Sequence, residues 1–441
     1  MRRALCPVEN LYVAQRSRAF LSCALRGNVD PSVLAEAFDA LTTEHPTLRS
    51  RIVPAEGGHA LELLPEDERP RLIRREGGDE AYGDEAYIEE LNVPLPVGGP
   101  LSRAALVTTG PDTHLLTVTI DHTVTDGHSA ITFMNALWDR YGELVATVPG
   151  QAPPAPVAEA EWPRPVSELL PAADPEETEK YLLRRVEETG AHPVELLAFD
   201  TPRDRPAGSE DPSEHRIEVR RLVLGAEETT RLRSAARDAG VSVHGLVAAA
   251  LMTAARARLD GDGPRVLGCM SPVDLRARLT PPVSPSVMVA SVTSHLQAVP
   301  VGGETDPLDL AREISTRLRE SVERGDHFHE MRIMPRVPAH PALQMGSVIV
   351  TNMGATAAPR FPEGVEGTDV RLVPARESYF PQAGRSPVMA CVVSFDNRLA
   401  VELPHHTACF TPQYMRAFRD DVRTALLAFT QDAAPAPASA G

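Results

Sequence analysis

The two halves of the chain carry a similar order of expected strands and helices, separated by a proline-rich stretch. Each half opens on an extended apolar segment, RAFLSCALRG at 18–27 and RIEVRRLVL at 216–224, and continues through helices with apolar residues at helical spacing. The prolines of residues 147–178 oppose regular structure and are typical of a linker. At 441 residues the chain is also too long for one hydrophobic core. We therefore expect an α+β fold of two lobes, each a sheet covered by helices.

The expected domain limits follow these changes in composition. They are a first lobe at 1–146, a crossover linker at 147–178, a second lobe at 179–431 and a disordered tail at 432–441. Asp30 and Pro31 mark the start of a helix in the first lobe, and Ser242 caps a buried helix in the second. The charge-rich residues 65–91 are expected to form a solvent-exposed insertion.

The composition restricts the partners and the location of the protein. The 44 basic and 61 acidic residues give a net charge of −17, which disfavours nucleic acid and anionic membranes as partners. No apolar run is long enough to span a bilayer, and the N-terminus does not have the pattern of a signal peptide. The five cysteines are scattered without a CxxC pair, which favours a reducing compartment over a disulfide framework or a zinc site. We expect a cytoplasmic protein that binds no metal.

Several enzyme classes lack the residues that their chemistry needs. Lys180 is the single lysine and follows no Gly-rich loop, which excludes a Walker A phosphate-binding loop. Its position on a solvated helix argues against a pyridoxal Schiff base. No GxSxG motif supplies the serine nucleophile of an α/β-hydrolase. His327 and His329 in DHFHE lack a third metal ligand, and an exposed polar turn is the simpler interpretation.

The stretch TVTIDHTVTDGHSA, residues 117–130, places a histidine between a strand and a helix. The strand pattern ends at His122, and Asp126 and Gly127 open the helix. A histidine on so short a turn can present one ring nitrogen to a cleft, and its ordinary pKa near ~6.5 leaves it mostly neutral at pH 7. It can then accept a proton from a nucleophile. The simpler alternative is that His122 only ends a strand and Asp126 only caps a helix.

The string HTVTDG has the form HxxxDG and resembles the signature of the chloramphenicol-acetyltransferase-like acyltransferases, the superfamily that includes condensation domains. The resemblance continues in AFDALTTEHPTLRSRI, SPVDLRARLTPP and VTNMG, and it covers most of the chain. Within the superfamily, the chain is most similar to the stand-alone polyketide-associated acyltransferases. The resemblance implies two chloramphenicol-acetyltransferase-like lobes that form a pseudo-dimer with a tunnel between them.

The resemblance also implies roles for the residues that match the signature. His122 would be the general base. Asp126 would point away from the histidine and hold the loop by pairing with an arginine. Arg276 is the first choice for this partner and Arg278 the second, with a solvated strand end as the alternative interpretation. Such a pair would tie the catalytic loop to the other lobe.

Four further residues have expected roles near the site. Gly127 would be a structural residue that permits close backbone approach or an unusual φ at the helix entrance. Asn352 lies at the end of an expected strand, where it could line the tunnel, help an oxyanion or simply form a turn. Arg278 and Ser129 are the other candidates for the tunnel wall.

The chain departs from the patterns of some relatives. Many condensation domains carry two adjacent histidines, whereas Asp121 precedes His122 here, and the second position is the usual base. DHTVTDGHS also fits DxxxxDxxS, the signature of heterocyclisation domains, but those domains generally lack the base histidine, so we treat the match as a coincidence. SFDNRL stands where the plant transferases carry DFGWG, which argues against that branch.

Together these features predict an acyltransferase of the HxxxD type that acts by direct transfer, without a covalent acyl-enzyme. It would move an acyl group from a thioester to a hydroxyl or amine of a polyketide, lipid or other secondary metabolite. The donor would be the phosphopantetheine of an acyl carrier protein, on a polyketide synthase or non-ribosomal peptide synthetase module, or coenzyme A. We expect no other cofactor and a monomer. The alternatives are a non-catalytic relative that binds carrier proteins, and an epimerase or cyclase relative of the same fold.

Overall fold

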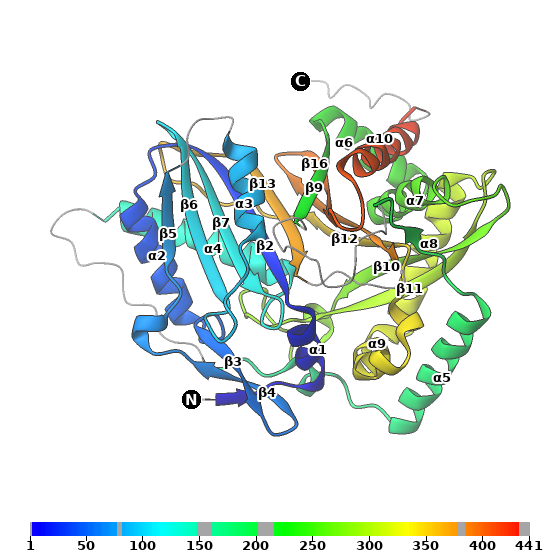
Figure 1. The fold of residues 1–441 in the computed structure, drawn as a ribbon, viewed down its shortest axis with the longest axis horizontal. Coiled ribbons are helices and arrows are strands. Elements are labelled where there is room, and N and C mark those ends of the chain that lie inside the picture. The colour runs from blue at the N-terminus through cyan, green and yellow to red at the C-terminus, as the bar shows by residue number, and fades with distance from the viewer. Residues whose placement is uncertain (1, 77–81, 148–160, 202–215, 378–383, 432–441) are drawn as a thin grey trace. The chain divides into compact units, whose positions relative to one another are not determined.

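The computed structural model describes residues 2–76, 82–147, 161–201, 216–377 and 384–431. The chain divides into two compact units with separate sheets (Figure 1). The first unit comprises Met1–Ala173, Asp274–Thr293 and Ala355–Tyr379, and the second comprises Asp174–Val273, Ser294–Gly354 and Phe380–Gly441. Two segments expected in a continuous second lobe at 179–431 therefore pack with the first unit instead. Each unit combines helices with a mainly antiparallel sheet, which confirms the predicted α+β class.

The first unit contains two sheets and the helices that pack on them. Its strands are β1 (Arg2–Ala4), β2 (Ser17–Gly27), β3 (Ser50–Ala55), β4 (Gly58–Leu63), β5 (Leu72–Glu76), β6 (Ser102–Gly110), β7 (Thr113–Asp121) and β13 (Val365–Arg376). Its helices are α1 (Pro7–Gln15), α2 (Pro31–Glu44), α3 (Tyr82–Asn92) and α4 (Gly127–Val145). Among the described residues, the larger sheet has the order β13–β2–β7–β6–β5 and the smaller one the order β1–β4–β3.

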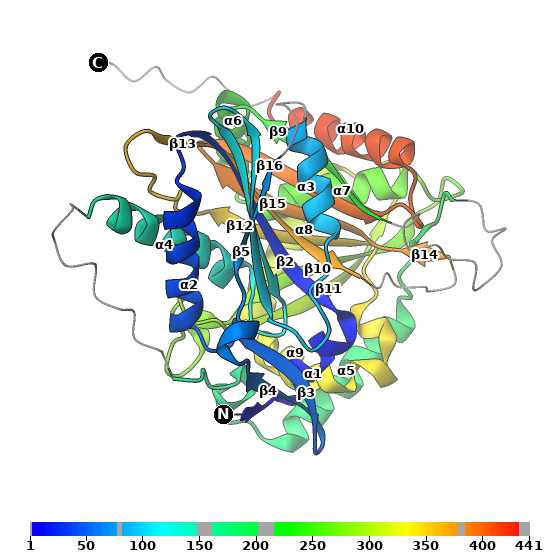
Figure 2. The ribbon, with the colours of Figure 1, turned by 60° about the vertical axis from the view of Figure 1, so that its left-hand side comes forward.

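The strand that precedes the candidate histidine, β7, lies in the middle of the larger sheet. It pairs antiparallel with β2 on one side and β6 on the other, and its residues from Leu115 to Ile120 are buried. Helices α2 and α4 pack side by side, and α3 packs on β6 and β7 (Figure 2). The predicted start of α2 is confirmed, because Asp30 accepts hydrogen bonds from the backbone N–H groups of Ser32 and Val33. The end of β7 is thus held on both sides by hydrogen-bonded neighbours.

Three parts of this unit differ from the sequence-based expectation. The charge-rich residues 65–91 are not a simple insertion, because β5 pairs in parallel with β6 and α3 packs on the sheet. β13 pairs antiparallel with β2 along its whole length, although no strand is expected there. The linker at 147–178 is shorter at its C-terminal end, because the next helix already begins at Pro175. Residues 148–160 of that linker and the tail at 432–441 lie outside the described residues.

The second unit is built around one larger sheet with the order β11–β10–β12–β15–β16–β9 within the described residues. Its strands are β8 (Leu197–Ala198), β9 (Ile217–Leu224), β10 (Arg265–Asp274), β11 (Val292–Val301), β12 (Val348–Ala355), β14 (Arg385–Ser386), β15 (Val388–Phe395) and β16 (Arg398–His406). Its helices are α5 (Pro175–Ala191), α6 (Ala226–Asp238), α7 (Val243–Arg256), α8 (Pro307–Glu323), α9 (Asp326–Ile333) and α10 (Pro412–Ala428). Ser242 caps α7 as predicted, and this mostly buried helix packs against α8 and α10.

Three features bear on membranes, disulfides and metals. In the described part of the chain no single helix could span a bilayer, whereas α6 and α7 together, bent by 101°, have the length and composition for one. The five cysteines are free and buried. Nowhere in the described ranges do three or more His, Cys, Asp or Glu side chains come together as a metal site would require.

Candidate active site

The loop between β7 and α4 is built by local hydrogen bonds. The carboxylate of Asp121 accepts the backbone N–H two residues further on at 2.8 Å, which turns the chain at the end of the strand. The backbone N–H of His122 donates to the carbonyl of Ser17 on β2 at 2.8 Å. Asp126 then caps α4, and its Oδ1 accepts the backbone N–H of Ser129 at 2.9 Å. The backbone positions of His122 and Asp126 are therefore fixed by the sheet and by the helix.

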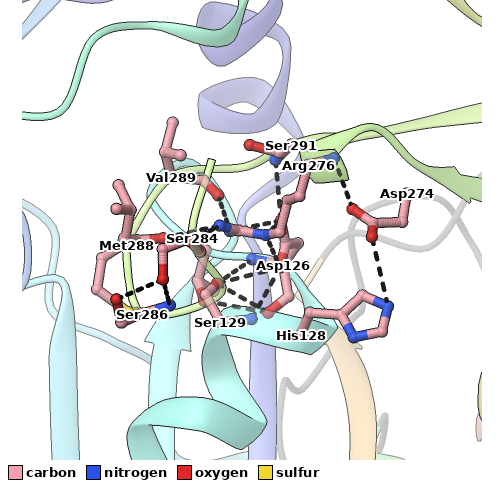
Figure 3. A network of polar contacts seen from close by, with 12 residues as sticks. Asp126, His128, Ser129, Asp274, Arg276, Ser284, Ser286, Met288, Val289 and Ser291 are labelled. Atoms are coloured by element: carbon pink, nitrogen blue, oxygen red, sulfur yellow. Dashed lines mark hydrogen bonds and ion pairs between the residues drawn. The ribbon is translucent and has the colours of Figure 1, made fainter. Parts of the chain in front are cut away.

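Asp126 forms a buried ion pair with Arg276 (Figure 3). Arg276 Nη2 and Nε donate to Asp126 Oδ2 at 2.8 and 3.1 Å, and the two side chains are only 3% and 4% exposed. The same oxygen accepts the backbone N–H of Ser291 at 2.9 Å. The predicted ion pair with Arg276 is therefore present. It does not tie the loop to the second unit, because residues 274–293 belong to the first.

Arg276 also organises the segment that follows it. Its Nη1 donates to the carbonyls of Ser284 and Val287 at 2.7 and 3.1 Å, and its Nη2 donates to the carbonyl of Val289 at 2.7 Å. A planar guanidinium with five donors suits this task better than an ammonium would. The second choice, Arg278, is exposed and donates to the carbonyl of Asp274 at 2.7 Å. Its guanidinium is therefore engaged outside the Asp126 ion pair.

The charge of Asp126 is used entirely within this network. Burial alone would raise the pKa of Asp126, but the Arg276 guanidinium and the N–H groups of Ser129 and Ser291 outweigh it and hold the pKa below its usual value. Both carboxylate oxygens accept hydrogen bonds from these partners. Asp126 is thus an anchor of the loop, and the structure shows no hydrogen bond from it to His122.

The ring of His122 is half-buried and has two notable neighbours. Burial lowers the pKa of His122 below its usual value, and the buried guanidinium of Arg376 on β13 acts in the same direction, while Asp126 acts against them. The ring of Tyr12 on α1 stacks on the imidazole, with ring centroids 4.9 Å apart and an angle of 13° between the planes. Burial therefore favours the neutral form of the imidazole. A neutral ring that keeps part of its surface accessible can act as a proton acceptor.

Sequence reasoning missed both of these neighbours. Tyr12 lies in PVENLYVAQ, a nine-residue helix whose apolar face is weak, so no periodic pattern marks it. Arg376 is the last residue of β13, which contains Pro374. A proline in a sequence pattern argues against a strand inside a sheet, so no strand is predicted there. The one available signal is the proline at the first position of α1, which is typical of a helix start.

The remaining candidates have mixed placements. Ser129 is fully buried, and its hydroxyl accepts the backbone N–H of Asp126 at 3.0 Å. It therefore holds the loop together, which differs from the predicted position in a tunnel wall. Gly127 begins α4 and is not among the described glycines with positive φ, so no unusual φ is needed there. Asn352 belongs to the second unit, is half-buried, and accepts the N–H of Gly354 at 2.9 Å through its Oδ1. A tunnel or oxyanion role for Asn352 stays a prediction.

Comparisons with known proteins define the class of the chain. The model of the condensation-domain family matches residues 15–258, which is more than half of the chain. A second model, described as the C-terminus of phthiocerol/phthiodiolone dimycocerosyl transferase, matches residues 213–404. Among curated proteins, phthiocerol/phthiodiolone dimycocerosyl transferase from Mycobacterium ulcerans is 26% identical over 427 residues, which cover 95% of each chain.

Solved structures show the same fold. Polyketide synthase associated protein 5 from Mycobacterium tuberculosis matches with a TM-score of 0.73 and 21% identity, covering 97% of this chain and 98% of that one. A trichothecene 15-O-acetyltransferase from Fusarium sporotrichioides matches with a TM-score of 0.73 and 12% identity, covering 97% and 95%. The similarity in sequence to named transferases identifies an acyltransferase, and the non-catalytic and epimerase or cyclase alternatives are not favoured. The chain belongs to the condensation-domain family.

Proposed function

We propose that the protein transfers an acyl group from a thioester to a hydroxyl group of a polyketide or lipid, with His122 as the general base. The observation that carries this proposal is the half-buried imidazole of His122 on a loop whose carboxylate, Asp126, is fully committed to Arg276. The names of the relatives support a hydroxyl acceptor, since one is a dimycocerosyl transferase for phthiocerol and another a 15-O-acetyltransferase. They do not favour the amine acceptor that the sequence leaves open.

The proposed reaction needs one proton acceptor and no covalent enzyme intermediate. Nδ1 of His122 is buried, so we assign the proton transfer to Nε2. Nε2 takes the proton of the acceptor hydroxyl as its oxygen attacks the thioester carbonyl carbon. The tetrahedral intermediate collapses with cleavage of the carbon–sulfur bond, and the imidazolium returns the proton to the leaving thiolate. An ester and a free thiol result, and His122 is neutral again.

The donor that we propose is an acyl group on the phosphopantetheine of a carrier protein. Support comes from solved structures described as a polyketide synthase associated protein and as the first condensation domain of the calcium-dependent antibiotic synthetase. Acyl-coenzyme A offers the same thioester and is the alternative donor. The proposal includes no further cofactor, a cytoplasmic location and a monomer.

Intact-protein mass spectrometry of an acyl-loaded carrier protein tests this proposal. The loaded carrier and a panel of long-chain alcohols are mixed with wild type, His122→Ala, or the control His192→Ala, which changes an exposed histidine in the second unit. Wild type and the control should unload the carrier and form an ester, whereas His122→Ala should be slower by about 10²- to 10⁴-fold. Consumption of acyl-coenzyme A alone would change the donor and keep the mechanism. Equal rates for wild type and His122→Ala with both donors would reject His122 as the base.

A further inference from the structure

A catalytic histidine is normally oriented by a hydrogen bond to its second ring nitrogen. His122 lacks this support, because its Nδ1 is buried and makes no hydrogen bond of acceptable geometry within the described residues. Its own backbone carbonyl is near enough to favour the protonated ring. The nearby carboxylate of Asp126 is committed to Arg276. Within the described residues no side chain orients the imidazole through a hydrogen bond to Nδ1, and a ring contact supports it instead.

The ring of Tyr12 makes that contact. It lies 4.9 Å from the imidazole, centroid to centroid, and nearly parallel to it at 13°. Two planar rings stacked in this way restrict each other's rotation and exclude water from the shared face. Burial raises the pKa of Tyr12 to about 12, so the phenol is neutral and adds no charge beside the base.

The helix that carries Tyr12 is anchored near its start. The backbone N–H of Cys6 donates to the fully buried carboxylate of Glu9 at 2.8 Å, and Arg3 pairs with the same carboxylate at 2.8 Å. Asn10 contacts Nδ1 of His59 on β4 through its Oδ1 at 2.9 Å. These contacts attach α1 to the smaller sheet of the same unit, so the position of Tyr12 is set by packing.

The end of α1 is held by the sheet that carries His122. Arg16, in the left-handed region with φ of 45°, turns the chain directly into β2 and pairs with Glu377. The next residue, Ser17, accepts the backbone N–H of His122. The stacking residue and the base are thus joined through one short stretch of backbone.

We propose that Tyr12 is the positioning residue of His122: its ring fixes the plane of the imidazole and closes one of its faces to water. This inference deepens the proposed function and rests on it for its kinetic test. It adds α1, a segment more than one hundred residues before the HxxxDG motif, to the catalytic unit. Tyr12 acts through His122 and does not take part in the proton transfer.

The charged groups around His122 have separate places. Arg376 on β13 lies opposite Ser17 on β2. Ser17 is also the residue whose carbonyl accepts the backbone N–H of His122. Asp126 lies on the helix side and is bonded to Arg276. Asp121 precedes the histidine and is bonded within its own turn. Tyr12 stacks on the imidazole, whereas the charged side chains that act on its pKa are Asp126 and Arg376.

A kinetic comparison of Tyr12→Ala and Tyr12→Phe tests the proposal. Tyr12→Phe keeps the ring and should stay within about twofold of the wild-type kcat. Tyr12→Ala should lower kcat about 10- to 100-fold with the donor KM nearly unchanged, as expected for a misplaced catalytic group. The matched control is Tyr414→Ala, which removes a tyrosine stacked on Phe410 at 5.0 Å and 9° in the second unit. Wild-type kcat in Tyr12→Ala, or an equal loss in Tyr12→Phe, would overturn the positioning role.

A second measurement does not depend on activity. The rate at which diethyl pyrocarbonate modifies His122, followed by peptide mass spectrometry between pH 5 and 8, reports the pKa of that ring, with His122→Gln as the blank. Loss of the Tyr12 ring admits water, so the pKa of His122 in Tyr12→Ala should rise toward ~6.5 and the modification should be faster. Tyr12→Phe and Tyr414→Ala should match wild type. Identical profiles for Tyr12→Ala and wild type would reject the inference even if no acyl transfer is ever detected.

Discussion

Asp126 and Arg276 lie 150 residues apart in the sequence and form an ion pair of 2.8 Å with both side chains almost fully buried. The pair fixes the loop after His122 to the segment at 274–293. Because the carboxylate of Asp126 is bonded to Arg276, it does not orient the histidine as the aspartate of a Ser-His-Asp triad does. The aspartate of the motif holds the loop, which leaves His122 free for the proton transfer that we propose.

Removal of either partner of this ion pair should destabilise the protein. Arg276→Met or Asp126→Ala leaves an uncompensated buried charge, which typically costs about 3–5 kcal/mol. The double variant should lose less than the sum of the two, since no charge is then left unpaired. Urea unfolding at pH 7 measures these free energies, and initial rates of acyl transfer should fall in parallel.

Arg278→Ala is the matched control, because it removes an exposed arginine two residues further along that does not contact Asp126. It should leave the unfolding midpoint and the rate near wild type. Equal midpoints for Arg276→Met and Arg278→Ala would contradict the anchoring role of the ion pair.

The acid side of the pH–rate profile should report the environment of His122. Its pKa is lowered by burial, so the ring stays neutral, and active as a base, below the pH at which a free histidine is half-protonated. We expect kcat/KM to be half-maximal at a pH below ~6.5 and to be flat above it. Initial rates between pH 4.5 and 8, corrected for hydrolysis of the donor alone, measure this point. A half-maximal pH at or above ~6.5 would mean that the ring is more hydrated than its burial implies.

Much of the fold can be predicted from the sequence because capping residues and apolar patterns occur where the helices begin and the strands are buried. The helix starts at Asp30 and Ser242 are encoded by capping side chains, and β2 and β7 are buried apolar runs. The ion pair of Asp126 is also predictable, but only through the resemblance to the family, since nothing local connects it with Arg276. Its assignment to one unit is not predictable, because contact between distant segments leaves no periodic trace.

The missing parts of the site have physical explanations. The apolar residues of α1 do not gather on one face, so no periodic pattern marks the helix that places Tyr12 on His122. Among the described strands, β13 lies at the edge of its sheet and pairs with β2. An edge strand tolerates a proline such as Pro374, whereas a proline in a sequence pattern argues against a strand. Tyr12 and Arg376, the two neighbours of His122, therefore come from a helix and a strand that their own sequences do not predict.

Three histidines with lowered pKa values should make the protein sensitive to acid. Burial lowers the pKa of each to about 4, and the three are His45, His244 and His405. Between that value and the ~6.5 of the unfolded chain, the unfolded state binds more protons than the folded one, so stability rises with pH. We expect the melting temperature to fall as pH is lowered from 7 to 4.5, beyond the effect of carboxylates, which titrate lower.

His244→Gln tests this acid dependence at one position. His244 Nε2 lies 2.8 Å from the hydroxyl of Ser271, and glutamine keeps a polar partner there without titrating in this range. The decrease in melting temperature between pH 7 and 4.5 should therefore be smaller in this variant, whereas His192→Gln, at an exposed position, should behave as wild type. A slope that His244→Gln leaves unchanged would assign the acid sensitivity to other groups.

Asp121 stands where many relatives carry a second histidine, and its role here should depend on one oxygen and not on its charge. Its Oδ1 accepts the N–H of Thr123 at 2.8 Å, and burial raises the pKa of its carboxyl. Asp121→Asn keeps an acceptor in the same place and should retain the wild-type rate within about threefold. Asp121→Ala leaves the N–H of Thr123 without its partner, which costs about 1–3 kcal/mol and loosens the turn before His122. The rate of Asp121→Ala should then fall at least as far as its stability, in the same transfer and unfolding assays. If Asp121→Asn is as slow as Asp121→Ala, the carboxylate charge itself contributes to the site.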